Sequence, residues 1–409
     1  MKVPGGMRIL GSMIGVALLA GCAHEIQKET ELHARAVSLA RECGIIDTHI
    51  DAPLRLHSRP TDVAVRSTEG EFDYERAREG GLRVPFMAIY VASETEGTGR
   101  AKPLADTLID IVEGIAQQHP DRFAIVRSVD EVRASMHSDR VLLAMGLENG
   151  SPLEGDLASV KYFYDRGIRY ITLAHAKWNH LCDAAYDTVR HWGGLSPFGR
   201  RVIAEMNRLG IMIDVSHLTD SAFSQILRLS KAPVIASHSS CRYFTPGFER
   251  NIDDDMIRSL AAGGGVVQVN FGSFCLTQAV NVYGVEQDRL LGIYLDEHTS
   301  GNRDSLEEDF LDRYHQAHPM PHATIADLAD HIDHIVKLVG IDYVGIGSDY
   351  EGVGHVPDGM DDVSRYPNLI EELLRRGYTD DMIRKICAEN LLRVWSAVER
   401  VARQEGQHP

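Results

Sequence analysis

Short apolar segments alternate with amphipathic segments from about residue 45 onward. The apolar segments are rich in Val, Ile and Leu, and most are continuous, which is typical of parallel strands buried on both faces. Eight of them predict strands, at residues 45–50, 84–91, 141–147, 170–174, 211–216, 233–237, 265–270 and 343–348.

Helical segments lie between these predicted strands. Apolar residues recur at helical spacing over 104–118, 156–166, 197–209, 219–229, 253–262 and 325–338. Strands that alternate with helices favour a parallel α/β sheet, and eight such units favour closure into a (β/α)8 TIM barrel. An open doubly wound sheet is the alternative, but no Gly-x-Gly-x-x-Gly motif follows the first strand to support it.

Two regions interrupt this alternation. Residues 276–322 form a long polar insertion after the seventh strand, of the kind that serves as a lid, an interface arm or surface decoration. Residues 368–402 have the spacing of C-terminal helices packed outside the barrel. We therefore expect a single barrel domain over 44–402 with the insertion 276–322, preceded by a tether and a first helix over 22–43.

The first 21 residues have the pattern of a secretory signal rather than of a folded segment. Lys2 and Arg8 precede an apolar run over 9–20, which is too short to cross a bilayer as a mature helix. The run ends in Leu-Ala-Gly-Cys22, which resembles the bacterial lipobox and implies lipid attachment to the Cys22 thiol. A plain signal peptide with a chance cysteine is the alternative. We expect an exported lipoprotein anchored to the bacterial envelope, facing the periplasm or the cell surface.

Composition and charge narrow the choice of partners. The 409 residues are 44% hydrophobic and 25% charged, as in a globular protein with a substantial core. The formal net charge of −17 argues against a nucleic-acid partner, which would require a basic face.

Imidazole and carboxylate side chains stand where the predicted strands end. In a (β/α)8 barrel, residues just past the carboxyl ends of the strands build the active site. Each of these residues alone has an ordinary explanation, as a loop cap or as a hydrogen-bonded core histidine. Their coincidence at six of eight strand ends is improbable by chance. The residues are His49 and Asp51, which strand alternation places on one side, and Glu148, His175, His217, His238 and Asp349.

This set of side chains predicts a metal site. Imidazole nitrogens and carboxylate oxygens are ligands that zinc accepts, and catalytic zinc sites keep one position for water. Two metals about 3.5–4 Å apart can hold a shared hydroxide and polarise a carbonyl group. The sequence therefore predicts a two-metal hydrolase.

The strand-end motifs resemble those of the membrane dipeptidase (renal dipeptidase-like) metallopeptidase family, a branch of the amidohydrolase-like barrels, here in a bacterial lipoprotein form. The similarity runs from about residue 44 to about residue 396. It rests on IDTHID at 46–51, GLE at 146–148, YITLAH at 170–175, MIDVSH at 212–217, SHSS at 237–240 and VGIGSDYEG at 344–352.

The resemblance implies two Zn²⁺ per chain. His49 and Asp51 match the ligands of one zinc, and His217 and His238 match those of the other. Glu148 matches the carboxylate that bridges the two metals.

The resemblance also implies roles for three residues that act on the substrate. Asp349 matches the acid/base aspartate, and His175 matches a histidine that polarises the substrate. Arg250 matches the arginine that holds the substrate carboxylate, with Arg242 in the same loop as its competitor.

The implied function is a zinc-dependent dipeptidase that hydrolyses dipeptides, including those with a C-terminal D-residue, by attack of a metal-bridging hydroxide. The family also leads us to expect a homodimer. Many other amidohydrolases use His-x-His and a modified lysine, whereas His49-x-Asp51 with Glu148 favours the dipeptidase branch. Two alternatives remain: another binuclear-metal amidohydrolase (a deacetylase, a lactonase or a β-lactam-type amide hydrolase), and a non-catalytic binding lipoprotein.

Overall fold

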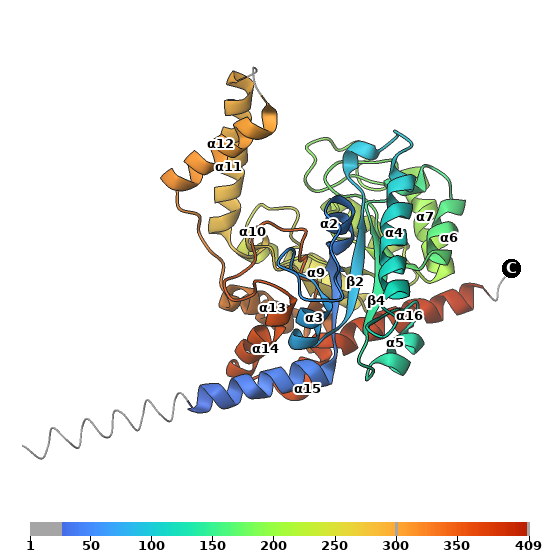
Figure 1. Ribbon diagram of the computed structural model, residues 1–409. Helices are drawn as coiled ribbons and strands as arrows, with labels where there is room; N and C mark the ends of the chain where they lie inside the picture. Colours follow the sequence, from blue (N-terminus) through green and yellow to red (C-terminus); the bar gives the residue numbers. More distant parts are fainter. Residues whose placement is uncertain (1–26, 299–301, 407–409) are drawn as a thin grey trace, which may run out of the picture.

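The computed structural model describes residues 27–298 and 302–406, and its centre is a closed parallel β-barrel (Figure 1). The strands follow the order β2-β1-β9-β8-β7-β6-β5-β4, and β4 pairs with β2 to close the ring. The predicted (β/α)8 fold is thereby confirmed, and each of the eight predicted strands is present. They are β1 Ile45–Ile50, β2 Leu82–Tyr90, β4 Val141–Glu148, β5 Ile168–Thr172, β6 Met212–Asp214, β7 Ile235–Ala236, β8 Val266–Val269 and β9 Val344–Ile346. The predicted signal segment and Cys22 lie outside the described residues.

Helices surround the barrel, and the six predicted ones all form. The largest shift of an end is at α4, predicted from residue 104 and observed over Ala101–Gln118. The other five are α6 Ala158–Asp165, α7 Pro197–Leu209, α8 Asp220–Leu229, α9 Asp254–Ala262 and α13 Ile325–Val339. Short helices α2 Ala52–Ser58 and α3 Tyr74–Gly80 lie between β1 and β2.

Local capping explains where several helices begin. The side chains of Ser196, Thr219 and Asp253 accept hydrogen bonds from backbone N–H groups in the first turns of α7, α8 and α9. Thr324 and Asp327 form a reciprocal capping box at the start of α13. These caps satisfy donors that would otherwise be unpaired at the helix ends.

The strand β3 was not predicted, and neither were the short helices α2, α3 and α5. β3 (Phe123–Ile125) pairs in parallel with β4 but lies outside the closed ring, and α5 (Val129–Ser135) follows it. Three residues are too few to show a periodic pattern, so β3 could not be recognised from its sequence.

Four helical segments of five or more residues follow β9, and the last two of them pack against the amino-terminal ends of the barrel strands. They are α14 Tyr366–Arg375, α15 Asp380–Arg384, a π-helical turn Lys385–Glu389 and α16 Asn390–Glu405. Ile46, Val84 and Leu142, from the amino-terminal halves of their strands, share one buried cluster with Trp395 of α16. The ring of Trp395 lies 5.4 Å from that of Phe86, centroid to centroid. This packing leaves the carboxyl end of the barrel for the polar side chains.

The predicted insertion contains a helical hairpin, which we call the arm. It consists of α11 (Gln278–Glu297) and α12 (Arg303–Ala317), after the short α10 (Ser273–Leu276), and it projects from the barrel mouth (Figure 1). Among its described residues, Val280 of α11 and Tyr314 of α12 are buried. Helices with so few buried positions lack the apolar stripe that predicts a helix from sequence. No helix in the described ranges is long and apolar enough to cross a membrane.

Candidate metal centre and active site

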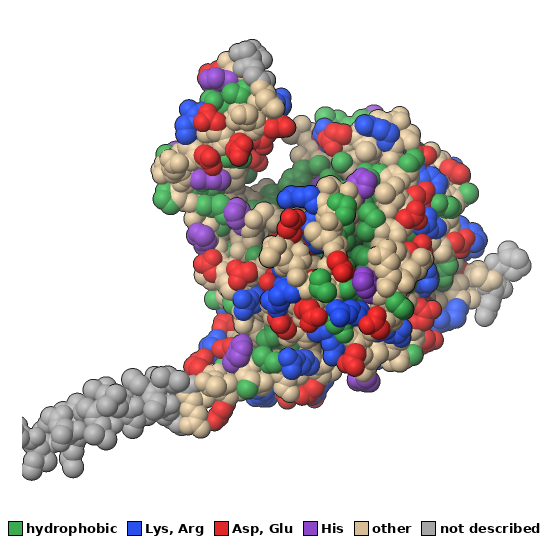
Figure 2. All heavy atoms as spheres, viewed as in Figure 1, with side chains coloured by type: hydrophobic (Ala, Val, Ile, Leu, Met, Phe, Trp, Pro, Cys, Tyr) green, Lys and Arg blue, Asp and Glu red, His purple; other side chains and the backbone are tan. Residues whose placement is uncertain are grey.

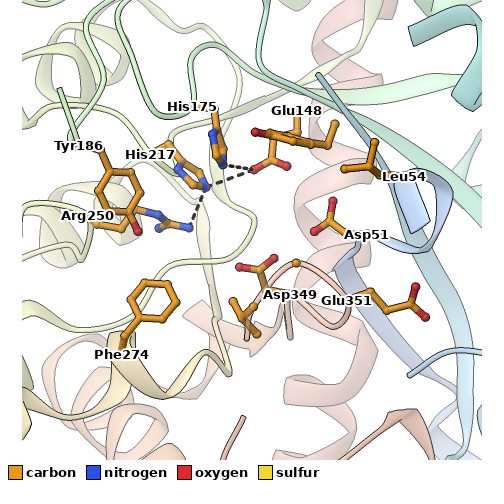
Figure 3. Close-up of a pocket in the computed structure, with 13 residues that line it drawn as sticks. Asp51, Leu54, Glu148, His175, Tyr186, His217, Arg250, Phe274, Asp349 and Glu351 are labelled. Atoms are coloured by element: carbon orange, nitrogen blue, oxygen red, sulfur yellow. Dashed lines mark hydrogen bonds and ion pairs between the residues drawn. The ribbon is translucent and has the colours of Figure 1, made fainter. Parts of the chain in front are cut away.

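The strand-end residues converge at the carboxyl end of the barrel. Side chains from β1, β4 and the loops after β5, β6, β7 and β9 meet around Glu148, which is the last residue of β4 (Figure 3). Groups of ligand atoms within 4.8 Å of one another include every metal ligand that the sequence suggested. The groups are His49 with Asp51 and Glu148; Glu148 with His175 and His217; and His49 with His238 and Asp349.

The two carboxylate oxygens of Glu148 face different ligand sets. Oε2 lies 3.2 Å from Nε2 of His49, which is itself 3.4 Å from Oδ2 of Asp51. Oε1 lies 3.2 Å from Nε2 of His217 and 3.3 Å from Nε2 of His238. A carboxylate with one oxygen toward each set has the arrangement of a bridging ligand.

The side chains present fit bound cations. Nε2 of His217 and Nε2 of His238 lie 2.8 Å apart, although both face the same Glu148 oxygen. Nε2 of His49 is buried and has no hydrogen-bond partner. Buried polar atoms are normally paired, so an unpaired ring nitrogen that faces carboxylates fits a metal ligand. In this donor set Asp51 and Glu148 could complete one site with His49.

The charged side chains of the site also fit a bound cation. Burial alone would lower the pKa of His49, but Tyr170, Glu148 and Asp51 together raise that pKa well above its ordinary value. Burial raises the pKa of Asp349, and although His49 opposes the rise, Asp51 and Glu148 add to it. Three buried carboxylates so close together repel one another, and a bound cation would relieve that repulsion.

The opposite ring nitrogens of two histidines are held by hydroxyl groups. Nδ1 of His49 lies 2.7 Å from the hydroxyl of Tyr170, and Nδ1 of His238 lies 2.7 Å from Oγ of Ser237. Ser237 in turn donates to the buried carboxylate of Asp214 at 2.6 Å. Such contacts fix the ring so that Nε2 points to the centre of the site, as around metal-binding histidines.

Backbone geometry at the strand ends aims the side chains. Between Asp47 and Ile50, β1 advances three residues while β2 advances two, from Pro85 to Met87, which is a β-bulge. His217 and Asp349 have φ values of 69° and 67°, in the left-handed region that residues other than glycine rarely adopt. Strained backbone of this kind is concentrated at functional sites, where the surrounding structure holds it in place.

Asp349 and His175 flank the ligand cluster. Oδ1 of Asp349 lies 4.0 Å from Nε2 of His49, and its Oδ2 accepts a hydrogen bond of 2.7 Å from Asn270. Nε2 of His175 lies 3.8 Å from Oε1 of Glu148, and the ring packs edge-on against Tyr90. Burial lowers the pKa of His175, which favours its neutral form. The geometry places both groups at the site, and it also puts each within a possible set of metal ligands.

Arg250 and Arg242, the two candidates for the substrate carboxylate, lie in different surroundings. Arg242 is engaged with Asp220, through hydrogen bonds of 2.8 Å and 2.5 Å. Arg250 is 3% exposed and donates to Oγ of Ser239 and to the carbonyl of His238. Within the described ranges, no carboxylate lies within 4.0 Å of its guanidinium nitrogens. A buried cation without a carboxylate partner suits an anionic ligand.

A cavity of about 300 Å³ opens over these groups, and we call it the catalytic cavity. Arg250, Tyr186 and Phe274 line one side of it, and Asp51 and Leu54 line the other (Figure 3). Gly352 also lines it, and a Cβ there would come within 2.1 Å of Oδ2 of Asp51 and 2.4 Å of Oδ1 of Asp349. A volume of this size accommodates a small molecule rather than a long peptide.

Three residues of the site were not predicted from the sequence. Tyr170 and Asn270 hold His49 and Asp349, and Tyr186 lines the cavity from the loop between β5 and α7. Asn270 is the last residue of the predicted strand 265–270, so its position was a signal that it belongs to the site, although its side chain is an amide rather than an acid or an imidazole. Gly146, opposite Tyr170 across the β4–β5 pair, was a second signal, because a Cβ there would meet the Tyr170 ring at 2.0 Å.

Barrels with acidic and histidine ligands at their strand ends are typical of metal-dependent hydrolases. The sequence profile of the family Membrane dipeptidase (Peptidase family M19) matches residues 33–408 of this chain. The chain belongs to this family of metallopeptidases, in agreement with the resemblance seen in its motifs.

Individual relatives agree with this assignment. Dipeptidase 3 of Rattus norvegicus is 31% identical over 391 residues, which cover 93% of this chain and 70% of that protein. The crystal structure of the probable dipeptidase PvdM from Pseudomonas aeruginosa is similar with a TM-score of 0.80 and 27% identity, covering 91% of this chain and 100% of that one. A metallo peptidase from Rhodobacter sphaeroides, liganded with a phosphinate mimic of the dipeptide L-Ala-D-Ala, has a TM-score of 0.71 and 26% identity, covering 87% and 99%.

Proposed function

We propose that this protein is a zinc-dependent dipeptidase that cleaves dipeptides at a two-metal centre. The observation that carries the proposal is the position of Glu148, whose two carboxylate oxygens face separate sets of ligands. His49 and Asp51 would hold one zinc ion, and His217 and His238 the other. Bound there, the two ions would activate the attacking water and polarise the scissile carbonyl group.

The remaining side chains of the cavity would orient the dipeptide and move protons. Arg250 pairs with the terminal carboxylate, which sets the distance from that carboxylate to the scissile bond and restricts the site to very short peptides. His175 donates a hydrogen bond to the scissile carbonyl oxygen as negative charge develops there. Asp349 accepts a proton from the attacking water and delivers it to the leaving amine nitrogen. Its hydrogen bond from Asn270 keeps the carboxylate oriented for both steps.

We include dipeptides with a C-terminal D-residue among the substrates. The Rhodobacter sphaeroides relative carries a phosphinate mimic of L-Ala-D-Ala, which supports this extension. A substrate panel tests the proposal: turnover of L-Ala-L-Ala and L-Ala-D-Ala is expected from the zinc-loaded protein. Hydrolysis of acetylated amines, lactones or β-lactams, with no turnover of any dipeptide, would instead identify another binuclear amidohydrolase.

Arg250→Ala is expected to raise KM for dipeptides by about 10- to 100-fold, because a charge-assisted hydrogen bond to the substrate is lost. A dipeptide amide lacks the terminal carboxylate, so its KM should hardly respond to the substitution. Arg242→Ala is the matched control, since Arg242 lies in the same loop but is bonded to Asp220. Equal KM changes for the dipeptide and its amide would rule out carboxylate recognition by Arg250.

We also propose that the chain is a lipoprotein anchored through Cys22. This proposal rests on the lipobox-like sequence Leu-Ala-Gly-Cys22 at the end of the apolar run. Cys22→Ser is expected to move the protein from the membrane fraction to the soluble fraction of its host, with dipeptidase activity retained. Fractionation by centrifugation, followed by immunoblotting, measures this. A variant that stays with the membrane would refute anchoring through this thiol.

A further inference from the structure

A second cavity, of about 550 Å³, lies between the arm and the barrel mouth, and we call it the outer cavity. Its barrel side includes the aromatic residues Tyr186, Phe248 and Phe274 together with His355. Its arm side includes Val280, Tyr283, Gly284 and Val285 of α11, with Asp288 among its polar residues. Figure 2 shows the hollow between the arm and the body of the molecule, with apolar side chains at its floor. The role of this space is not explained by the metal centre.

The outer cavity adjoins the catalytic cavity. Tyr186 and Phe274 line both of them. The three aromatic rings form a connected series, with centroids 5.9 Å apart for Tyr186 and Phe248 and 6.1 Å apart for Phe248 and Phe274. The Tyr186 ring also lies 5.9 Å from that of His217. Tyr186, whose ring packs against His217, is therefore also part of the wall of the outer cavity.

The position of Arg250 decides which part of a dipeptide reaches this boundary. Its guanidinium lies beside His217, between Tyr186 and Phe274 (Figure 3). In a dipeptide, the terminal carboxylate and the C-terminal side chain are attached to the same Cα atom. With the carboxylate at Arg250, the side chain on that carbon would lie next to Tyr186 and Phe274, which line both cavities. The amino-terminal residue would then face the opposite side of the catalytic cavity, which Leu54 lines.

We propose that the outer cavity receives the C-terminal side chain of the substrate, so that the arm gives a preference for dipeptides with a large apolar or aromatic C-terminal residue. The inference rests on the proposed dipeptidase function. Apolar and aromatic walls provide surface against which such a side chain is removed from water. Alanine in the same position would leave most of this surface uncovered.

Gly284 offers a direct test. It lines the outer cavity, and a Cβ at this position would meet no atom within 4 Å, so a large side chain can be added without a local clash. Gly284→Trp should fill part of the cavity. Gly292 lies on the same helix, has equally open space around its Cβ position and does not line the cavity, so Gly292→Trp is the matched control.

For the zinc-loaded parent protein, we expect kcat/KM to be about 10-fold or more higher for Ala-Phe than for Ala-Ala, because the larger side chain is buried. Gly284→Trp should remove this advantage while changing kcat/KM for Ala-Ala by less than about 3-fold, and Gly292→Trp should retain it. Calorimetry with phosphinate mimics of Ala-Phe and Ala-Ala gives the same comparison without turnover. Their affinities should differ in the parent and converge in Gly284→Trp.

A second pair of variants tests the same inference in case Gly284→Trp does not fold. Val285 lines the outer cavity and is 62% exposed, whereas Val282 is 53% exposed and lies outside it. Val285→Asp should selectively weaken turnover of Ala-Phe, and Val282→Asp should not. Turnover of Ala-Ala with no preference for Ala-Phe, or a preference unaffected by Gly284→Trp and Val285→Asp, would overturn the inference alone. A zinc-loaded protein that cleaves no dipeptide would overturn the proposed function and this inference with it.

Discussion

Glu148→Ala is expected to abolish dipeptide hydrolysis, with kcat/KM lower by at least about 10³-fold, because both metal positions lose a ligand together. Zinc content should fall from about two equivalents per chain to less than one. The reason lies in the geometry, since one oxygen of Glu148 faces His49 and the other faces His217 and His238. Elemental analysis of the purified variant, together with dipeptide turnover, measures both effects.

Glu96 provides the control for this substitution. Its Oε1 lies 2.8 Å from Nδ1 of His180, so it is also a histidine-paired glutamate, but it does not line the catalytic cavity. Glu96→Gln should therefore retain zinc and activity. Circular dichroism should show that Glu148→Ala remains folded. A folded Glu148→Ala protein with unchanged zinc content would refute the bridging role.

Asp349→Asn is expected to separate metal binding from proton transfer. The amide keeps the size of the side chain and can still accept a hydrogen bond from Asn270, but it cannot take up the proton of the attacking water. We expect kcat to fall by about 10²- to 10⁴-fold, the usual contribution of general acid–base catalysis, with about two zinc equivalents retained.

The zinc content of Asp349→Asn also distinguishes the two roles that the geometry allows. Asp349 lies in one possible ligand group with His49 and His238. Loss of one zinc equivalent would show that Asp349 is a ligand rather than the acid/base group. Full zinc occupancy together with unchanged kcat would contradict the proton-transfer role. Asn270→Ala should have a smaller effect of the same kind, because it leaves the carboxylate in place.

The fold could be predicted because parallel barrel strands are buried on both faces and so appear as continuous apolar runs. The same reasoning located the strand ends, and in a barrel the strand ends are enough to place His49, Glu148, His217 and His238 together. These side chains are far apart in the sequence, yet β4 and its neighbours bring their ligand atoms within a few ångströms.

Some side chains of the site could not be predicted, because their contacts leave no periodic pattern in the sequence. The hydroxyl of Tyr170 meets His49 across 121 positions of sequence, and Asn270 meets Asp349 across 79. The two helices of the arm were not predicted for a different reason. Its helices bury almost no apolar stripe, so their spacing resembled that of a polar loop, and the outer cavity beneath them could not be inferred.

Metal analysis combined with a zinc-dependence assay is the most direct test of a two-zinc dipeptidase centre. Such a centre predicts about two zinc equivalents in the purified protein, loss of L-Ala-D-Ala hydrolysis after chelation, and recovery of that hydrolysis when zinc is returned. A protein that hydrolyses the dipeptide equally well with and without metal, or that binds no zinc and cleaves no dipeptide when zinc is supplied, would rule it out.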